Sequence, residues 1–171
     1  GKHREKVRVG QEGDTLVLES IGRVQDREIT VSYPKKTEFE EASVDVVAGT
    51  VNLDDNFYAK KLEVSVAAGE FTNDSTITAE KAELTVGTGN IDLENLKVQN
   101  LEADCGIGNI DLGIDGKEKD YDYEISCAAG AIDIGDSSFS GLGHEKKISN
   151  PGSSGKMTFD CGVGNITVDF E

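Results

Sequence analysis

Three aspartates occupy the same place in a recurring motif and are the strongest candidates for chemistry in this chain. Asp92, Asp111 and Asp133 each stand third after a glycine and directly after an isoleucine. If the motif stacks as neighbouring parallel strands, these carboxylates lie about 4.8 Å apart. Such a pair could hold a divalent cation weakly. The spacing also resembles the roughly 5–5.5 Å between the acid and the nucleophile of a retaining glycosidase.

A solvated acidic face explains the same three aspartates without chemistry. Two carboxylates at this distance repel by only about 1 kcal/mol in water, so an open face tolerates them. Nothing in the sequence marks one of them as buried, and the chain has no Trp to stack on a sugar ring. We therefore expect Asp92, Asp111 and Asp133 to face water, with weak cation or ligand binding as the first alternative and catalysis as the second.

The three cysteines resemble a metal site only at first sight. Each stands three residues before a glycine, where the preceding repeats carry valine. Buried cysteine packs as a small hydrophobe, and an odd number of cysteines argues against a disulfide framework. We therefore expect buried free thiols in an inward-facing column and no metal site. The column comprises Val46, Val66, Val86, Cys105, Cys127 and Cys161.

Residues 135–156 form the second candidate site because they interrupt the repeat. Insertions in repeat folds project from one face, and loops on a rigid scaffold often carry recognition. A cap folded over the C-terminal repeats is equally consistent with the composition of the segment. A recognition loop would use Phe139, Leu142, His144, Lys146 and Lys147.

The other motifs that suggest catalysis or cofactor binding lack essential parts. His3 and His144 are the only histidines, which leaves a Ser-His-Asp arrangement without support. Gly87-Thr88-Gly89 and Gly106-Ile107-Gly108 begin like a dinucleotide loop, but the third glycine and the following helix are missing. The sequence therefore predicts no catalytic residue and no cofactor, and it indicates that the protein is not an enzyme.

The elements that position these residues come from a repeat of about twenty residues. Its anchor glycines are spaced by 20, 20, 19, 22 and 34 residues, and self-similarity at such a period is typical of solenoids. Apolar residues alternate with polar ones on both sides of each glycine, which is the pattern of a strand with one buried face. We call each repeat a rung. The anchors are Gly49, Gly69, Gly89, Gly108, Gly130 and Gly164.

The alternation predicts an all-β fold, a single-stranded parallel β-solenoid with rungs of about twenty residues. Asn90, Asn109 and Asn165 each follow an anchor glycine, and stacked amides of this kind support such a structure. We expect residues 1–14 to be a flexible extension and residues 15–171 to be one domain. Within it, residues 15–42, including TLVLES and REITVSYP, form an incomplete first rung or a cap, residues 43–171 form the rungs, and residues 135–156 are the inserted loop.

The repeated G-N-I-D-L and A-G-x-I-D motifs, together with ITVSYPKK before the first full rung, resemble a bacterial family. This family consists of adhesin-like domains of unknown function with β-strand repeats, and the resemblance covers roughly residues 15–171. It implies a right-handed, single-stranded parallel β-helix on envelope-associated proteins with an N-terminal anchor. It supplies no catalytic residues.

The charge limits the choice of partner. The 17 Lys and Arg residues are outnumbered by 33 Asp and Glu residues, which gives a net charge of -16. Nucleic acid is a poor partner for such a chain because binding requires clustered basic residues. No segment reaches the roughly twenty apolar residues of a membrane span. The chain opens with Gly1, so we expect an export signal or anchor upstream.

Composition and resemblance together predict a non-enzymatic scaffold of the bacterial cell envelope or surface, serving adhesion or envelope sensing. Its partner would be a protein or a cell-envelope glycan, and its location extracytoplasmic, with a cytoplasmic location as the alternative. The rival functions are a polysaccharide-active β-helix enzyme that uses the stacked aspartates, and a structural protein that assembles end to end. The sequence leaves the ligand and the oligomeric state open.

Overall fold

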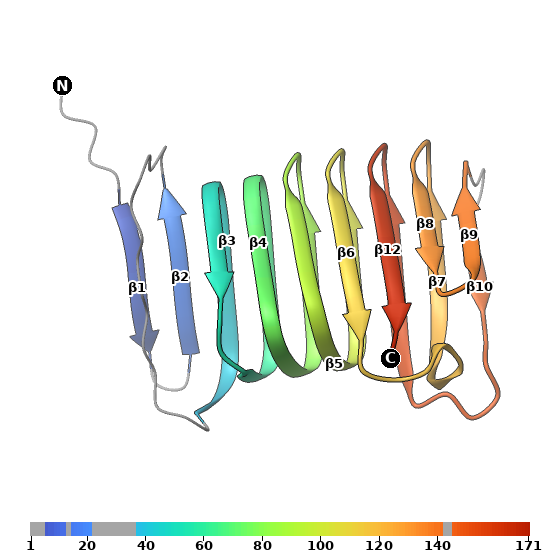
Figure 1. The fold of residues 1–171 in the computed structure, drawn as a ribbon, viewed down its shortest axis with the longest axis horizontal. Coiled ribbons are helices and arrows are strands. Elements are labelled where there is room, and N and C mark those ends of the chain that lie inside the picture. Colours follow the sequence, from blue (N-terminus) through green and yellow to red (C-terminus); the bar gives the residue numbers. More distant parts are fainter. Residues whose placement is uncertain (1–5, 13–14, 22–36, 142–144) are drawn as a thin grey trace.

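The computed structural model describes residues 6–12, 15–21, 37–141 and 145–171. The chain is all-β, and its strands form one curled sheet whose turns stand side by side along the long axis (Figure 1). The all-β class predicted from the alternation is confirmed. The strands are β1 (Lys6–Glu12), β2 (Thr15–Ile21), β3 (Glu38–Leu53), β4 (Phe57–Val86), β5 (Asn90–Cys105), β6 (Asn109–Ile114), β7 (Tyr121–Cys127), β8 (Ala131–Ile134), β9 (Ser137–Ser140), β10 (Lys146–Ile148), β11 (Gly155–Cys161) and β12 (Asn165–Phe170), with a short 3-10 helix η1 (Glu118–Asp120) before β7.

Successive turns pair in parallel, with partners about one repeat apart. Val44 lies beside Val64 between β3 and β4, and Leu84 lies beside Ala103 between β4 and β5. Antiparallel pairs occur at both ends, where β1 joins β2, β9 joins β8 and β10 joins β7. The sheet is therefore mixed and solenoid-like, whereas the sequence predicted a parallel solenoid throughout.

The order of the rungs in space differs from their order in the chain. The C-terminal rung, formed by β11 and β12, lies between the rung that ends in β6 and the rung formed by β7 and β8. In Figure 1 the red strand β12 stands between β6 and β8. The expected stack of Asp92, Asp111 and Asp133 assumed that rungs neighbour each other in chain order, and this was wrong. Alternating apolar residues fit the same core from either position, so the alternation carries no information about order.

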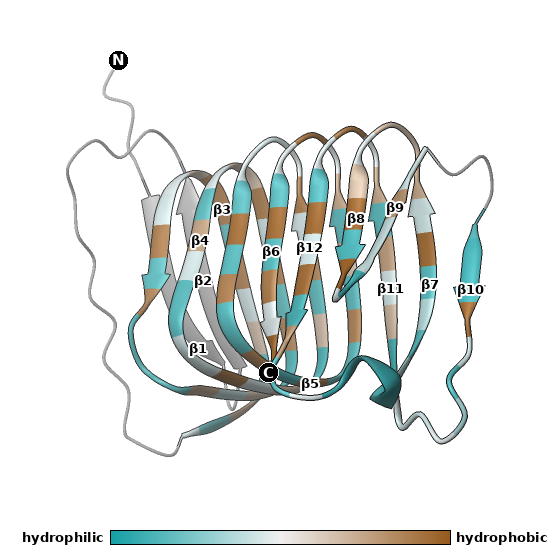
Figure 2. Cartoon of the chain, turned by 45° about the vertical axis from the view of Figure 1, so that its right-hand side comes forward, coloured by the Kyte–Doolittle hydropathy of each residue, from teal (hydrophilic) through white to brown (hydrophobic). Residues whose placement is uncertain are grey.

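The core runs through the interior as continuous columns. Ile91, Ile110, Ile166 and Ile132 occupy one such column, and the exposed fraction of each is 0%. Figure 2 shows the resulting alternation of hydrophobic and hydrophilic bands along the strands. Each such side chain contributes roughly 1.5–3 kcal/mol through burial. The inward positions read from the sequence are confirmed.

The anchor glycines lie where neighbouring turns approach most closely. A Cβ placed on Gly108 would lie 1.7 Å from the carbonyl oxygen of Gly89, and one on Gly164 would lie 1.9 Å from that of Gly108. Backbone atoms cannot yield as a flexible side chain does, so these corners require glycine. The same contacts place the anchors in the order Gly89, Gly108, Gly164, Gly130.

The two ends of the sheet differ from the predicted boundaries. Residues 1–14, which we expected to form an extension, contain β1, and residues 15–42 contribute β2, which pairs in parallel with β3. The predicted strand REITVSYP lies outside the described residues. The insertion 135–156 supplies β9 and β10, which add antiparallel edge strands to the rung formed by β7 and β8.

Candidate functional site

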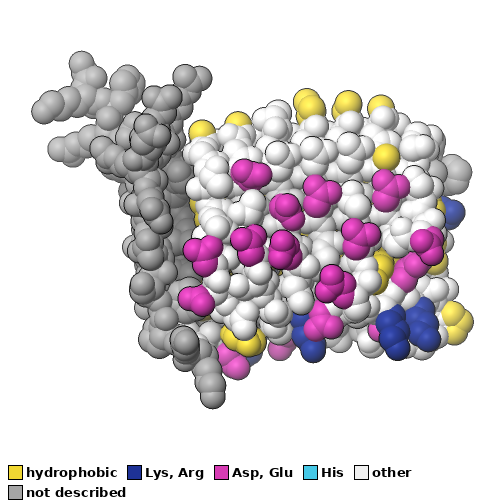
Figure 3. Space-filling view, viewed as in Figure 1, with side chains coloured by type: hydrophobic (Ala, Val, Ile, Leu, Met, Phe, Trp, Pro, Cys, Tyr) yellow, Lys and Arg dark blue, Asp and Glu magenta, His cyan; other side chains and the backbone are white. Residues whose placement is uncertain are grey.

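The acidic face is made by the outward residues that follow the anchor glycines. Asp92 of β5 and Asp111 of β6 are register partners, as the sequence predicted. Thr167 of β12 lies between Asp111 and Asp133, so the expected run of three aspartates is broken. The inserted C-terminal rung is the cause of this correction. Figure 3 shows acidic side chains spread over this face, with basic ones confined to its lower margin and right-hand side.

An open groove of about 760 Å³ runs beside the Asp92–Asp111 pair. Asp169 of the C-terminal rung lines it with the pair, as does Asn95, whose buried Oδ1 has no hydrogen-bond partner. The carboxylates lining the groove come from Asp74, Asp92, Glu94, Asp111, Asp169 and Glu171.

The acidity of Asp92 reflects its surroundings. Partial burial raises the pKa of this carboxyl, and the negative charges of Asp111 and Asp74 raise it further. A raised pKa means that the folded protein holds the Asp92 proton more tightly than an isolated aspartate does. Among the described residues, no group of three or more His, Cys, Asp or Glu side chains is arranged to hold a metal ion.

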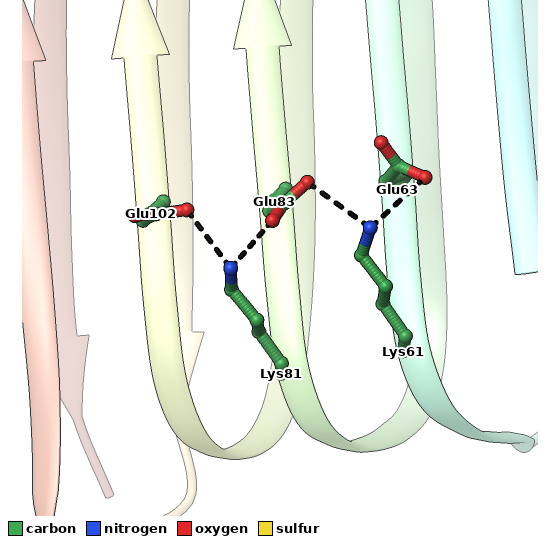
Figure 4. Close-up of polar contacts among 5 residues, drawn as sticks. All are labelled: Lys61, Glu63, Lys81, Glu83 and Glu102. Atoms are coloured by element: carbon green, nitrogen blue, oxygen red, sulfur yellow. Dashed lines mark ion pairs between the residues drawn. The ribbon is translucent and has the colours of Figure 1, made fainter. Parts of the chain in front are cut away.

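The opposite face carries a ladder of ion pairs, which we call the Lys–Glu ladder (Figure 4). Lys61 lies 3.4 Å from Glu63 of its own rung and 3.6 Å from Glu83 of the next. Lys81 repeats the pattern one rung later, at 2.6 Å from Glu83 and 3.3 Å from Glu102. Each lysine therefore ties its own turn to the following turn.

The ladder changes the acidity of its members in the direction opposite to that on the acidic face. A hydrogen bond from Lys81 is the main cause that lowers the pKa of Glu83, and the charge of Lys61 adds to it. The hydrogen bond to Glu83 in turn raises the pKa of Lys81. Both partners therefore favour their charged forms.

The three cysteines lie in the inward column that the sequence assigned to them. Their spatial order is Cys105, Cys161, Cys127, because the C-terminal rung lies between the other two. All three are buried free thiols. The thiols of Cys105 and Cys161 donate hydrogen bonds to the carbonyl oxygens of Gly108 and Gly164. Burial is the main cause that raises the pKa of Cys161 to about 12.

The predicted recognition loop contributes its described residues to the end of the sheet. Phe139 of β9 packs into the core with an exposed fraction of 9%, and the Nζ atom of Lys146 lies 4.6 Å from the centre of its ring. Lys147 pairs with Glu124 at 3.0 Å and with Glu145 at 2.9 Å. Leu142 and His144 lie outside the described residues. Phe139 therefore pairs with β8, and Lys147 contacts β7.

Sequence reasoning missed two features of the acidic groove. Asn95 carries no charge and interrupts the alternation beside a shift in register, so it gave no signal. Asp169 belongs to the C-terminal rung and reaches the groove only because that rung lies beside β6. The likeness between CGIGNIDL and CGVGNITV was the available signal that these two rungs are neighbours.

The comparisons with known proteins add a family and nothing more specific. The family model described as Toastrack DUF4097 matches residues 2–143. No curated protein and no solved structure matches the chain. Within the described residues, no helix has the length and apolar character needed to cross a membrane.

Proposed function

The chain belongs to the Toastrack DUF4097 family, whose model covers residues 2–143, and we propose that it is a non-enzymatic scaffold that presents its acidic face to a basic partner. The family is one of unknown function with β-strand repeats. The finer description of the fold that we propose is a right-handed, single-stranded β-helix whose stiffness keeps this face in shape. A protein segment rich in Lys and Arg is the partner that the charge fits best.

The unequal pairing of the two faces carries this proposal. The acidic face holds carboxylates that pair with no Lys or Arg in the described part of the chain, whereas each glutamate of the Lys–Glu ladder pairs with a lysine. Unpaired charge of one sign attracts a partner of the other sign and speeds the encounter. These carboxylates include Glu70, Asp74, Asp92, Glu94, Asp111, Asp133 and Asp169.

Titration with a fluorescent oligoarginine peptide tests the proposal. The triple variant Asp92→Asn, Asp111→Asn, Asp133→Asn should weaken binding, and the remaining affinity should depend less on salt. A matched control removes three carboxylates from the other face through Glu63→Gln, Glu83→Gln and Glu102→Gln. It should leave most of the affinity intact. Equal losses in the two triples would show that only net charge matters, and the proposal would fail.

Glycoside hydrolysis is the rival function, and one observation favours it. Asp92 and Asp111 are neighbours, and the raised pKa of Asp92 is the property that a general acid needs. Against it, both side chains are exposed, on an open face. Release of reducing sugar from envelope polysaccharides by the wild type, lost in the Asp→Asn triple, would establish the enzyme and overturn the scaffold.

We further propose an extracytoplasmic location at the bacterial envelope, in adhesion or envelope sensing, with an anchor preceding the chain. The family resemblance and the acidic surface support this location. Fractionation of cells that express the full-length protein, with protease added from outside, tests it. Protection from the protease in intact cells together with recovery in the soluble fraction would favour the cytoplasmic alternative.

A further inference from the structure

The C-terminal rung connects two parts of the sheet that do not otherwise pair. In the described strands, no register pair joins β7 or β8 to β5 or β6. Strand β11 lies between β5 and β7, and β12 lies between β6 and β8. The rung of β7 and β8 therefore depends for its place in the sheet on a segment that comes later in the chain.

Backbone hydrogen bonds hold the C-terminal rung on both sides at its corner. On one side, the amides of Gly162 and Val163 donate to the carbonyl oxygens of Cys105 and Gly106, each at 2.8 Å. On the other side, Ala128 donates to the carbonyl oxygen of Cys161 at 2.9 Å. If the rung left, four strand edges would lose their partners, and such edges pair readily with another chain. The slot would therefore need a new occupant.

The fit of this rung depends on the repeat and not on a unique shape. Its inward residues Met157, Phe159 and Cys161 continue columns that contain Leu101, Ala103 and Cys105. The segment after β10 leads into this rung. A C-terminal rung from a second copy presents the same residues in the same register, so it would fit the slot equally well.

The segment that leads into β11 is held by a polar latch at Asp122. The backbone amide of Asn150 donates to Asp122 Oδ1 at 2.7 Å, and the hydroxyl of Ser153 donates to the same oxygen at 2.8 Å. These hydrogen bonds lower the pKa of Asp122. Polar contacts at a partly exposed site can exchange with water, so the latch can open without loss of core packing.

We propose that two copies of this chain exchange their C-terminal rungs, residues 155–170, to form a reciprocal rung-swapped dimer. Each slot is then filled by the partner copy, and every strand pair of the monomer is kept. Domain swapping costs little for this reason, since only the hinge changes its conformation. In this dimer the Asp122 latch sets the balance between the closed monomer and the exchanged pair. The inference goes beyond the scaffold function and does not depend on it.

Disulfide trapping between two differently marked full-length chains tests the exchange. One chain carries Asp104→Cys and the other Asp160→Cys. These exposed positions are register partners between β5 and β11, so the new cysteines lie at a separation that a disulfide can span. After co-expression and mild oxidation, a covalent heterodimer should form. A single chain that carries both substitutions should form the disulfide internally, which confirms the geometry.

A matched control pair lies in the same outward column between rungs that follow chain order. Thr85 and Asp104 are exposed register partners of β4 and β5, so Thr85→Cys and Asp104→Cys on separate chains should give no covalent heterodimer. Adding Asp122→Ala to both chains of the first pair should increase its heterodimer several-fold by opening the latch. Product from both pairs indicates non-specific contact, and product from neither indicates a closed monomer. Either result overturns the proposal.

Discussion

The two outward faces of the same rungs differ in whether their charged side chains form ion pairs. On one face, a lysine column stands two residues from a glutamate column, so that Lys61 and Lys81 each reach glutamates of two turns. On the other face, Asp92 and Asp111 are neighbours, and the described residues place no basic column beside them. Both faces share the strand register and the core. The net charge of -16 is therefore unevenly placed.

The difference shows that, in a repeat protein, whether a charged side chain forms ion pairs depends on the columns of equivalent residues beside it. Neighbouring turns lie about 4.8 Å apart, so like charges in one column lie close together and repel each other. This repulsion is offset only where an adjacent column carries the opposite charge. The Lys–Glu ladder meets this condition and the acidic face does not. The Lys–Glu ladder stabilises the stack slightly, whereas the acidic face keeps a negative electrostatic potential that can attract a partner.

The first prediction tests the core beneath both faces. Ile110→Asp should destabilise the fold by about 4 kcal/mol or more, because it places an unpaired charge in a column whose members are fully buried. Asp111→Ala, one residue away on the acidic face, should change the free energy of unfolding by about 0.5 kcal/mol or less. Urea denaturation measures both. Similar losses would mean that the inward and outward assignment is mistaken.

The second prediction concerns the cysteine column, which lies in the core that the two faces enclose. Ellman's reagent should label almost none of Cys105, Cys161 and Cys127 in the native protein and all three after denaturation, because burial protects the thiols and raises the pKa of Cys161 to about 12. Rapid labelling of two or more in the native state would contradict the register of the whole stack.

The sequence was sufficient to predict what each position faces. Alternation about the anchor glycines gave the inward isoleucines and the cysteine column. The predicted asparagine ladder is also confirmed, since Asn109 donates to Asn90 at 3.1 Å and Asn165 donates to Asn109 at 3.2 Å. These features follow from the period alone, because every turn points equivalent positions to the same side, inward or outward.

The alternation of apolar and polar residues was not sufficient to predict which rung neighbours which. Residues 121–134 and 155–168 carry equivalent inward residues, so hydrophobic burial does not distinguish the two orders. The corners do distinguish them. The rungs with Gly106-Ile107-Gly108-Asn109 and Gly162-Val163-Gly164-Asn165 lie side by side, and the one with Ala128-Ala129-Gly130 lies outside them. The broken aspartate run and the place of Asp169 in the groove follow from this order.

The third prediction compares the response of the two faces to salt. Glu83→Gln should lower the melting temperature at low salt, and Asp111→Asn should raise it slightly, because one removes an attraction and the other removes a repulsion. Added salt screens both interactions, so both differences from the wild type should shrink toward zero from opposite sides. Melting curves over a salt series would show this. A shift of the same sign in both variants would remove the proposed difference between the faces.

The fourth prediction gives the carboxylates of the two faces opposite effects on stability at neutral pH. Folding raises the pKa of Asp92, so its ionised form destabilises the native state at neutral pH. Asp92→Asn should therefore be slightly more stable than the wild type at pH 7. The gain should begin to shrink as the pH falls through the raised pKa and vanish only below the ordinary pKa of aspartate. Folding lowers the pKa of Glu83, so its contribution is favourable above the ordinary glutamate pKa and is lost as the pH falls through the lowered value. Glu83→Gln should be less stable at pH 7, and its deficit should persist until the pH is below the ordinary glutamate pKa. Urea denaturation of both variants and the wild type across this range measures the two effects. A stability change of the same sign in both variants at pH 7 would contradict the opposite pKa shifts of Asp92 and Glu83.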